Sequence, residues 1–523
     1  MKNIKTISQF KPKCLMVILD GFGIREENLK NAIAAANPPT INSLFKNYPN
    51  TLVQSGGEFV GLPKGLAGNS EVGHLNLGSG RSIRQDLVRI NESIKEETLQ
   101  ELPEFKKLLE KVRTKNKIHL MALLSDGGVH SHLDHLKYII KLINQHIPKA
   151  DIYLHGFMDG RDTPKNEGIN YLKNILESDL NFTLASIQGR SIGMDRDQRW
   201  EKIRTAYEMM TDQKDQSISV DVNPLEYMQS QYDQNIFDEF ILPTLFEKEG
   251  VIRTEEPIFF INFRPDRAKQ ISLAFTDPNF KHFSRDFLSP YFLCMTPYIQ
   301  EEMPEVPILF DKEKIKLTLS EYLSKLGKKQ FKIAETEKYA HVTYFFNGGE
   351  ETPFKNEERK LVLSPKDVET YDLKPEMSAF IVTENLKDKI QSDEHDFYLV
   401  NYANADMVGH TGNFEAAVQA IEALDKCLQE LIKVCTEKDI PILLTADHGN
   451  ADQMVYEDGR THTSHSTSPV PLILIHPELK NCVLELNQDI KNSQPALKDI
   501  APTVLSIMGL EIPNEFTGKP VFK

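Results

Sequence analysis

Aspartate and histidine recur in the C-terminal third of the sequence at spacings that suit metal binding. Asp406 and His410 are four residues apart, so a helical turn would place both side chains on one face. Asp447 and His448 are adjacent and follow an apolar run. Mixed carboxylate and imidazole ligands favour Mn²⁺ or Zn²⁺, whereas oxygen ligands alone favour Mg²⁺ or Ca²⁺. These residue types therefore predict a metal centre.

A polar loop that follows them, residues 461–468, contributes two more histidines, His462 and His465. An Asp–His pair at helical spacing is more often a surface ion pair, and a single loop histidine is more often solvated. The adjacent pair Asp447 and His448 is the stronger indication, because two titratable side chains share one turn.

A glycine-rich segment, residues 61–74, contains a candidate nucleophile. Ser70 lies among glycines, and His74 follows four residues later. The segment is neither a Walker A loop nor a G-x-S-x-G nucleophile turn. Glycines let a backbone approach a ligand closely, and a metal can activate a serine hydroxyl for attack. An equally compatible alternative is that Ser70 caps the N-terminus of a short helix.

Cationic side chains gather in the middle of the chain, mostly just after apolar runs. A guanidinium group forms paired, charge-assisted hydrogen bonds with phosphate or carboxylate. The alternative is that these arginines are solvated, since the chain has 61 lysines and arginines. Their shared position favours a site for a small anion. The candidates are His130, Arg161, Asp162, Arg190, Arg196, Arg264 and Arg267.

Short apolar runs that alternate with longer amphipathic segments must position these groups. The runs typical of buried strands span residues 15–19, 118–124, 152–157, 182–187, 258–263, 397–401, 442–445 and 472–475. Residues 131–147, with Ser131 as the expected N-cap, and residues 414–434 have helical periodicity. Strands alternating with helices predict an α/β fold with mostly parallel sheets, whose ligands lie beyond the carboxyl ends of the strands.

Composition excludes several classes of protein. The 523 residues carry a net charge of −15, with 40% apolar and 26% charged residues, as in ordinary soluble proteins. Disorder is excluded, and an acidic balance argues against a nucleic-acid partner. No apolar run is long enough to span a membrane, and the run at 14–19 is too short for a signal peptide. Five cysteines without CxxC spacing indicate reduced thiols, so we expect a cytoplasmic protein.

The order of the candidate residues predicts the domain organisation. Metal-ligand candidates lie near residues 20–70 and again at 406–465, and the arginines lie between them. We therefore expect two α/β domains, a discontinuous metal-binding domain (1–84 and 308–523) and an inserted substrate domain (85–307), with the active site in a cleft between them. Residues 78–82 and 301–307 are the expected hinges.

Six short motifs follow one another along nearly the whole chain. They are LDGFG at 19–23, GNSEVGH at 68–74, SDGGVH at 125–130, DGRD at 159–162, NFRPDR at 262–267 and ADHGN at 446–450. Each motif alone is modest. In this order and number they closely resemble the cofactor-independent (2,3-bisphosphoglycerate-independent) phosphoglycerate mutase family of the alkaline-phosphatase-like superfamily.

The resemblance implies a phosphatase-like domain that holds two Mn²⁺ ions, with Mg²⁺, Co²⁺ or Zn²⁺ as alternatives, interrupted by a phosphotransferase domain. The positions that match the first metal's ligands are Asp406, His410 and His465, so His462 is not included. Those that match the second metal's ligands are Asp20, Ser70, Asp447 and His448. The matching substrate-binding positions are His130, Arg161, Asp162, Arg190, Arg196, Arg264, Arg267 and Lys338.

The implied activity is interconversion of 3-phosphoglycerate and 2-phosphoglycerate through a phosphoserine, in glycolysis and gluconeogenesis. Ser70 would be the nucleophile, Asp162 the general acid and base, and Lys338 a stabiliser of phosphoryl charge. We expect a monomer whose only partner is its small-molecule substrate. The alternatives are a metal-dependent phosphohydrolase or pentose-phosphate mutase of the same superfamily, or a non-catalytic anion-binding protein.

Overall fold

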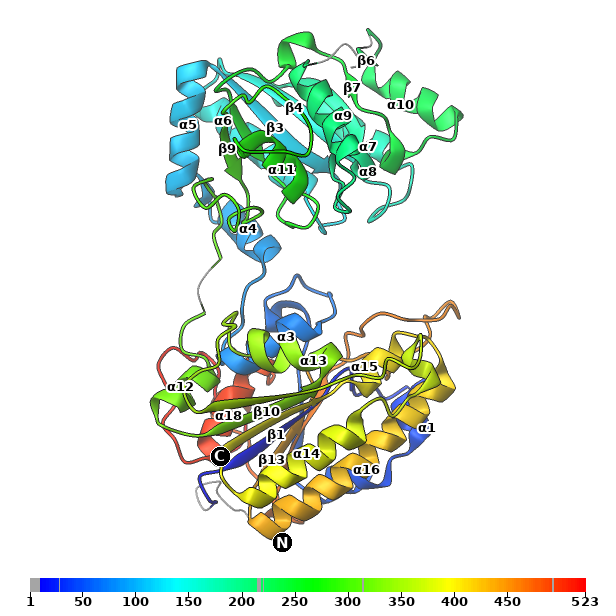
Figure 1. Cartoon of the computed structure of the whole chain (residues 1–523), viewed down its shortest axis with the longest axis vertical. Helices are drawn as coiled ribbons and strands as arrows, with labels where there is room; N and C mark the ends of the chain where they lie inside the picture. Colours follow the sequence, from blue (N-terminus) through cyan, green and yellow to red (C-terminus); the bar gives the residue numbers. More distant parts are fainter. Residues whose placement is uncertain (1–9, 28, 214–217, 220, 313–314, 492) are drawn as a thin grey trace. The chain divides into compact units, whose positions relative to one another are not determined.

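The computed structural model describes residues 10–27, 29–213, 218–219, 221–312, 315–491 and 493–523. The chain divides into two compact units: unit 1 comprises Met1–Gln85 and Lys314–Lys523, and unit 2 comprises Asp86–Glu313 (Figure 1). Unit 2 continues beyond residue 307, the expected end of the insertion. The reason is that Leu309 and Phe310 hydrogen-bond to the main chain of Cys294 and Met295 and are buried in the core of this unit.

Unit 1 is built on a seven-stranded sheet in the order β11-β10-β12-β1-β13-β14-β2. The strands are β1 (Cys14–Leu19), β2 (Asn50–Val53), β10 (Gln330–Glu335), β11 (Glu357–Val362), β12 (Phe397–Tyr402), β13 (Ile442–Thr445) and β14 (Val470–Ile475). Pairing is parallel from β11 to β13, whereas β14 and β2 are antiparallel to their neighbours. Every residue of β1 is buried, as expected for a central strand covered on both faces.

Helices cover both faces of this sheet. On one face α16 packs against α1, α2, α14 and α15, and elsewhere α18 contacts β1 and α3. The helices of unit 1 are α1 (Ala32–Ala36), α2 (Pro39–Asn47), α3 (Ser70–Ser79), α12 (Leu319–Lys325), α13 (Thr336–Ala340), α14 (Ala379–Ser392), α15 (Asn404–Gly409), α16 (Phe414–Lys438), α17 (Gln488–Lys491) and α18 (Ile500–Ile507).

Unit 2 has its own seven-stranded sheet, in the order β6-β7-β5-β4-β3-β8-β9. The strands are β3 (Lys117–Leu124), β4 (Asp151–Met158), β5 (Thr183–Gly189), β6 (Ile218–Ser219), β7 (Thr244–Leu245), β8 (Pro257–Phe260) and β9 (Tyr291–Cys294). Only the β5–β7 pairing is antiparallel among these strands. The helices are α4 (Asp86–Lys95), α5 (Pro103–Lys115), α6 (Leu133–His146), α7 (Gly168–Leu176), α8 (Arg190–Gly193), α9 (Trp200–Thr211), α10 (Pro224–Asp233) and α11 (Lys269–Thr276).

The α/β fold class and the expected strands are confirmed, with shifts of a few residues at their ends. The expected cap of α6 is wrong. His132, not Ser131, is the N-cap, and its ring nitrogen accepts the hydrogen bond from the Asp134 N–H. Ser131 is buried one residue before this position.

Neither expected hinge coincides with a limit between the units. Gly78 and Ser79 form the last turn of α3, and Gly80 closes this helix in the left-handed conformation, with φ of +62°. Residues 301–307 belong to unit 2, where Met303 and Val306 are part of the core. Across the described part of the chain, no helix combines the length and apolar character needed to cross a membrane.

Candidate active site

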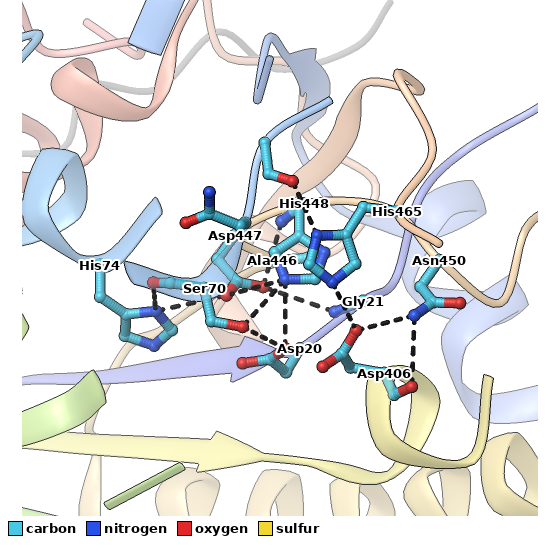
Figure 2. A network of polar contacts seen from close by, with 12 residues as sticks. Asp20, Gly21, Ser70, His74, Asp406, Ala446, Asp447, His448, Asn450 and His465 are labelled. Atoms are coloured by element: carbon cyan, nitrogen blue, oxygen red, sulfur yellow. Dashed lines mark hydrogen bonds and ion pairs between the residues drawn. The ribbon is translucent and has the colours of Figure 1, made fainter. Parts of the chain in front are cut away.

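Three adjacent parallel strands of unit 1 bring the acidic candidates to one edge of the sheet. Asp20 directly follows β1, Asp406 lies in α15 just after β12, and Asp447 follows β13. Because parallel strands end at the same edge, their carboxylates meet there. All three are buried, as is His448 beside Asp447. Figure 2 shows these side chains pointing toward one another.

The side chains form two overlapping groups suited to cations. Ligand atoms of Asp406, His448 and His465 lie within 4.8 Å of one another, and so do those of Asp20, Asp447 and His448. His410 joins the first group, because its Nε2 lies 3.2 Å from Oδ1 of Asp406. The structure therefore brings together the six aspartates and histidines that were predicted as metal ligands.

The histidine rings are oriented as metal ligands usually are. The Nδ1 atoms of His410 and His465 lie 2.7 and 2.9 Å from the carbonyl oxygens of Thr463 and Gly68. A carbonyl only accepts, so each Nδ1–H donates to it and each Nε2 is left with its lone pair. Both Nε2 atoms converge on Asp406 Oδ1 and are 3.1 Å apart. Lone pairs facing a carboxylate fit a cation between them.

The other histidine of the loop at 461–468, His462, does not lie with these ligands. His462 is buried and stacks edge-on against Tyr456, with 4.4 Å between ring centroids. Its ring does not belong to either group of potential ligands in the described residues. His465, by contrast, belongs to the first of these groups.

Ser70 is the first residue of α3 and does not cap it. The N-cap is Asn69, whose side chain accepts the hydrogen bond from the N–H of Val72. The alternative that Ser70 caps the helix is therefore wrong. Its Oγ instead lies 3.0 Å from Nε2 of His448 and 3.2 Å from Oδ1 of Asp20.

Lys338 is the cation at the centre of this arrangement. It lies in α13, directly after β10, and its Nζ is 2.6 Å from Oδ1 of Asp20, 2.6 Å from Oδ2 of Asp406 and 2.7 Å from Oγ of Ser70. Burial alone would lower the pKa of Lys338, but the carboxylates raise it above its ordinary value. Burial would raise the pKa of Asp406, yet the positive charge of Lys338 holds it well below its ordinary value. Both groups are therefore charged.

The mid-chain candidates form a second cluster, entirely within unit 2. They follow the adjacent strands β5, β4, β3 and β8, again at the carboxyl ends. Arg190 is fully buried and pairs with Asp159 and Asp162. Asp159 also accepts hydrogen bonds from the Ser125 hydroxyl and from the N–H groups of Arg161 and Asp162. Asp159 thus holds the loop that carries two predicted substrate residues.

Asp266 ties together other members of the cluster. Its Oδ2 lies 2.8 Å from Nη1 of Arg196, and its Oδ1 lies 3.2 Å from Nε of Arg264. His130 is 3.5 Å from the same oxygen, and burial together with Arg190 lowers the pKa of His130 to about 4. The ring is therefore neutral near pH 7. Arg196 and Arg264 remain about half exposed, which leaves guanidinium groups available to an anion.

The remaining two arginines differ in setting. Arg267 is buried and donates to the carbonyl oxygen of Met194. Arg161 is 59% exposed and lies 3.4 Å from Glu239. Asp159 and Asp266 lie in the motifs at 159–162 and 262–267, but they were not predicted as site residues. A carboxylate that holds arginines in place has the same charge as one that binds a ligand, so the sequence did not separate the two roles.

Comparison with known proteins adds independent findings. A family model described as the Metalloenzyme superfamily matches residues 12–512. The 2,3-bisphosphoglycerate-independent phosphoglycerate mutase of Clostridium novyi is 45% identical over 522 residues, which cover 98% of this chain and 100% of that protein. That of Acetivibrio thermocellus is also 45% identical, over 97% of this chain and 98% of its own. A solved structure of Leishmania mexicana phosphoglycerate mutase at low cobalt concentration has a TM-score of 0.67 and 26% identity, and the match covers 100% of this chain and 99% of that one.

Proposed function

This chain belongs to the 2,3-bisphosphoglycerate-independent phosphoglycerate mutase family of metalloenzymes, and on that basis we propose how its residues carry out the reaction. As a member it is an isomerase that interconverts 3-phosphoglycerate and 2-phosphoglycerate, a step of glycolysis. We propose that Ser70 carries the phosphoryl group between the two positions. The observation that supports this most directly is the position of the Ser70 hydroxyl, which lies within hydrogen-bond distance of Lys338, His448 and Asp20.

The donor set of unit 1 fits two cations. Asp406, His410 and His465 would hold one, and Asp20, Ser70, Asp447 and His448 the other. Nitrogen and oxygen donors together favour Mn²⁺, with Co²⁺ and Zn²⁺ as the nearest alternatives and Mg²⁺ less well matched. When bound, the cations would lower the pKa of the Ser70 hydroxyl and offset negative charge on the phosphoryl oxygens.

The residues would then act in two symmetric half-reactions. Ser70 Oγ, deprotonated before the first step, attacks phosphorus in line while Asp162 is protonated, and the bond from phosphorus to the 3-oxygen of the substrate breaks. Asp162 gives a proton to that oxygen, which yields phosphoserine and glycerate. Asp162 then takes a proton from the 2-hydroxyl, whose oxygen attacks the phosphoserine and regenerates Ser70. Lys338 stabilises the charge on the transferring group.

Unit 2 would bind the glycerate part of the substrate. Its arginines suit a carboxylate, because a guanidinium offers two parallel donors. A mutase must keep the glycerate bound until the second half-reaction. If the glycerate were released, water would hydrolyse the phosphoserine, and the protein would act as a phosphohydrolase of the same superfamily. We therefore assign His130, Arg161, Arg190, Arg196, Arg264 and Arg267 to substrate binding.

A Ser70→Ala variant tests the nucleophile. We expect loss of mutase activity and of the phosphoenzyme that mass spectrometry of the intact protein detects after incubation with 3-phosphoglycerate and Mn²⁺. Ser79→Ala is the matched control, because Ser79 is a buried serine of the same helix whose hydroxyl donates to the Arg81 carbonyl. Turnover by Ser70→Ala would refute the assignment. Release of inorganic phosphate by the native protein, in place of 2-phosphoglycerate, would favour a phosphohydrolase.

A further inference from the structure

Two buried side chains contact the residues around Ser70 without being candidate metal ligands themselves. They are His74 of α3 and Asn401 of β12, and both are fully buried. His74 lies four residues after Ser70, so one face of α3 carries both. Figure 2 shows the His74 ring directed toward Ser70 and Asp447.

The hydrogen bonds of Asn401 define its orientation. Its Nδ2 lies 2.8 Å from Oδ2 of Asp20 and 3.0 Å from Nε2 of His74. A carboxylate only accepts, so Asp20 requires the amide nitrogen on its side. The second amide hydrogen is then directed at His74. The Oδ1 atom of Asn401 is buried and has no hydrogen-bond partner among the described residues. The orientation of this amide therefore satisfies its two N–H donors and leaves its oxygen acceptor unsatisfied.

This orientation also sets the tautomer of His74. Since Nε2 accepts the hydrogen bond from Asn401, the proton of the neutral ring is on Nδ1. That nitrogen lies 2.8 Å from the carbonyl oxygen of Ser70 and 3.3 Å from Oδ2 of Asp447. The Nδ1–H therefore donates to the backbone carbonyl of Ser70. Oδ2 of Asp447, which accepts no hydrogen bond among the described residues, lies in contact beside the same nitrogen.

We propose that His74, held in this tautomer by Asn401, is a positioning residue for the second metal site. A single chain of contacts, Asp20–Asn401–His74–Asp447, orients two of the carboxylates assigned to that site and the first turn of the helix that begins with Ser70. Residues that orient metal ligands in this way typically contribute 10- to 100-fold to metal affinity or activity. The inference rests on the proposed function only for the role of Ser70, because the effect on metal binding is measured without substrate.

Two substitutions of His74 separate its nitrogens. In His74→Asn the amide nitrogen reaches approximately the place of Nδ1, whereas in His74→Gln it reaches that of Nε2. We expect His74→Gln to weaken Mn²⁺ binding at one site about 10- to 100-fold, and His74→Asn to retain most of the affinity, as measured by calorimetry or electron paramagnetic resonance. Equal affinities in the two variants, whether native or reduced, would overturn the proposal.

Nitrogen NMR of the native, metal-free protein labelled with ¹⁵N-histidine tests the tautomer without any substitution. We expect the His74 ring, assigned through bonds from its own backbone resonances, to show a protonated Nδ1 and an unprotonated Nε2. A protonated Nε2 would overturn the proposal, even if the His74 variants failed to fold.

His341→Asn is the control for packing. The His341 ring lies 5.4 Å from that of His74, and its Nδ1 has no hydrogen-bond partner among the described residues. We expect native Mn²⁺ affinity in this variant, and a loss equal to that of His74→Gln would refute positioning through hydrogen bonds. Weakened Mn²⁺ binding in His74→Gln would stand even if no phosphoenzyme were found, so the failure of the proposed function is a separate outcome.

Discussion

The charge of Lys338 is the most consequential single-residue feature of unit 1. Its ammonium contacts two buried aspartates, Asp20 and Asp406. Taking such carboxylates out of water is costly, so in the absence of a metal the lysine is their main counter-charge. A bound cation would take over part of that task, because it would contact the same oxygens. The metal-free and metal-bound proteins should therefore depend on Lys338 to different degrees.

A Lys338→Met variant tests this dependence. In the presence of a chelator we expect the free energy of unfolding to fall by about 3–5 kcal/mol, the usual cost of leaving a buried charge unpaired. With saturating Mn²⁺ the deficit should be smaller, as measured by urea unfolding followed by circular dichroism. Lys325→Met is the control, since Lys325 is an exposed lysine paired with Glu321 on α12. An equal deficit with and without Mn²⁺ would contradict the idea.

The residues of the candidate site were predictable from sequence to different extents. Asp20 and Asp447 stand next to turn residues at the ends of apolar runs, where the geometry of parallel sheets collects ligands. Asn401 also ends a predicted strand, but an uncharged amide in a strand has no pattern that indicates a function. Ser70 could have been a cap, and only the structure shows that Asn69 takes that place.

Among the elements, α3 owes its close approach to the sheet to a glycine. An added Cβ on Gly73 would lie 2.8 Å from Cβ of Asp447 and 2.9 Å from its carbonyl oxygen. These are backbone or near-backbone atoms that cannot rotate away. Any larger side chain at this position must push the first turn of α3, and Ser70 with it, away from Asp447.

A Gly73→Ala variant should consequently lose activity. Alanine favours a helix over glycine by about 1 kcal/mol, so the helix itself would gain stability. We nevertheless expect kcat to fall about 100-fold, the effect of displacing a reacting group by roughly 1 Å, in an assay of 2-phosphoglycerate formation. Glu71→Ala is the control, because it changes an exposed residue of the same helical turn. Native kcat in Gly73→Ala would argue against the steric explanation.

Strand β10 shows where the prediction of elements failed. Its sequence QFKIAE mixes apolar and polar residues, yet all six residues are buried. Lys332 lies 3.1 Å from Glu357 of β11, and both side chains are fully buried. Strands with buried ion pairs lack the continuous apolar run by which β1 and β13 were recognised. Hydropathy alone therefore missed an interior strand of the sheet, between β11 and β12.

At the scale of the whole molecule, the net charge does not describe the local charge of either unit's candidate site. The net charge of −15 conceals the arginines of unit 2, whereas the buried aspartates of the metal site belong to unit 1. If unit 2 binds the substrate and unit 1 binds the metal ions, a substitution in one unit should leave the binding function of the other unit unchanged. Sequence order alone predicted this division, because the arginines lie between two groups of metal-ligand candidates.

An Arg264→Ala variant tests the division. Loss of one charge-assisted hydrogen bond to the substrate should lower kcat/KM about 10- to 100-fold, corresponding to about 1.5–3 kcal/mol. Mn²⁺ affinity, measured by calorimetry, should stay native. Arg113→Ala removes an exposed arginine from α5 of the same unit and should change neither quantity. Loss of Mn²⁺ affinity in Arg264→Ala would show that the two functions are not separate.

Buried histidines make the stability of unit 2 sensitive to acid. Burial lowers the pKa of His135 to about 3, and it also lowers the pKa of His119 and of His155. An unfolded histidine has a pKa of about 6.5. As the pH falls below that value, the unfolded chain binds protons that the folded unit excludes. Stability is therefore full above about pH 6.5 and is lost toward pH 3, by up to about 1.4 kcal/mol per pH unit for each such histidine.

A His135→Gln variant isolates one of these contributions. Nε2 of His135 lies 2.7 Å from Oδ1 of Asn91, and the amide of glutamine can donate to the same oxygen without titrating. We expect the slope of unfolding free energy against pH, between about pH 6 and 4, to decrease by about 1.4 kcal/mol per pH unit. This is the contribution of one proton that the unfolded chain binds and the folded unit excludes. The single tryptophan, Trp200 in α9 of this unit, reports the transition by fluorescence in urea. His146→Gln, at an exposed position of the same helix, should keep the native slope. An unchanged slope in His135→Gln would mean that the buried ring is already protonated in the folded unit over this range.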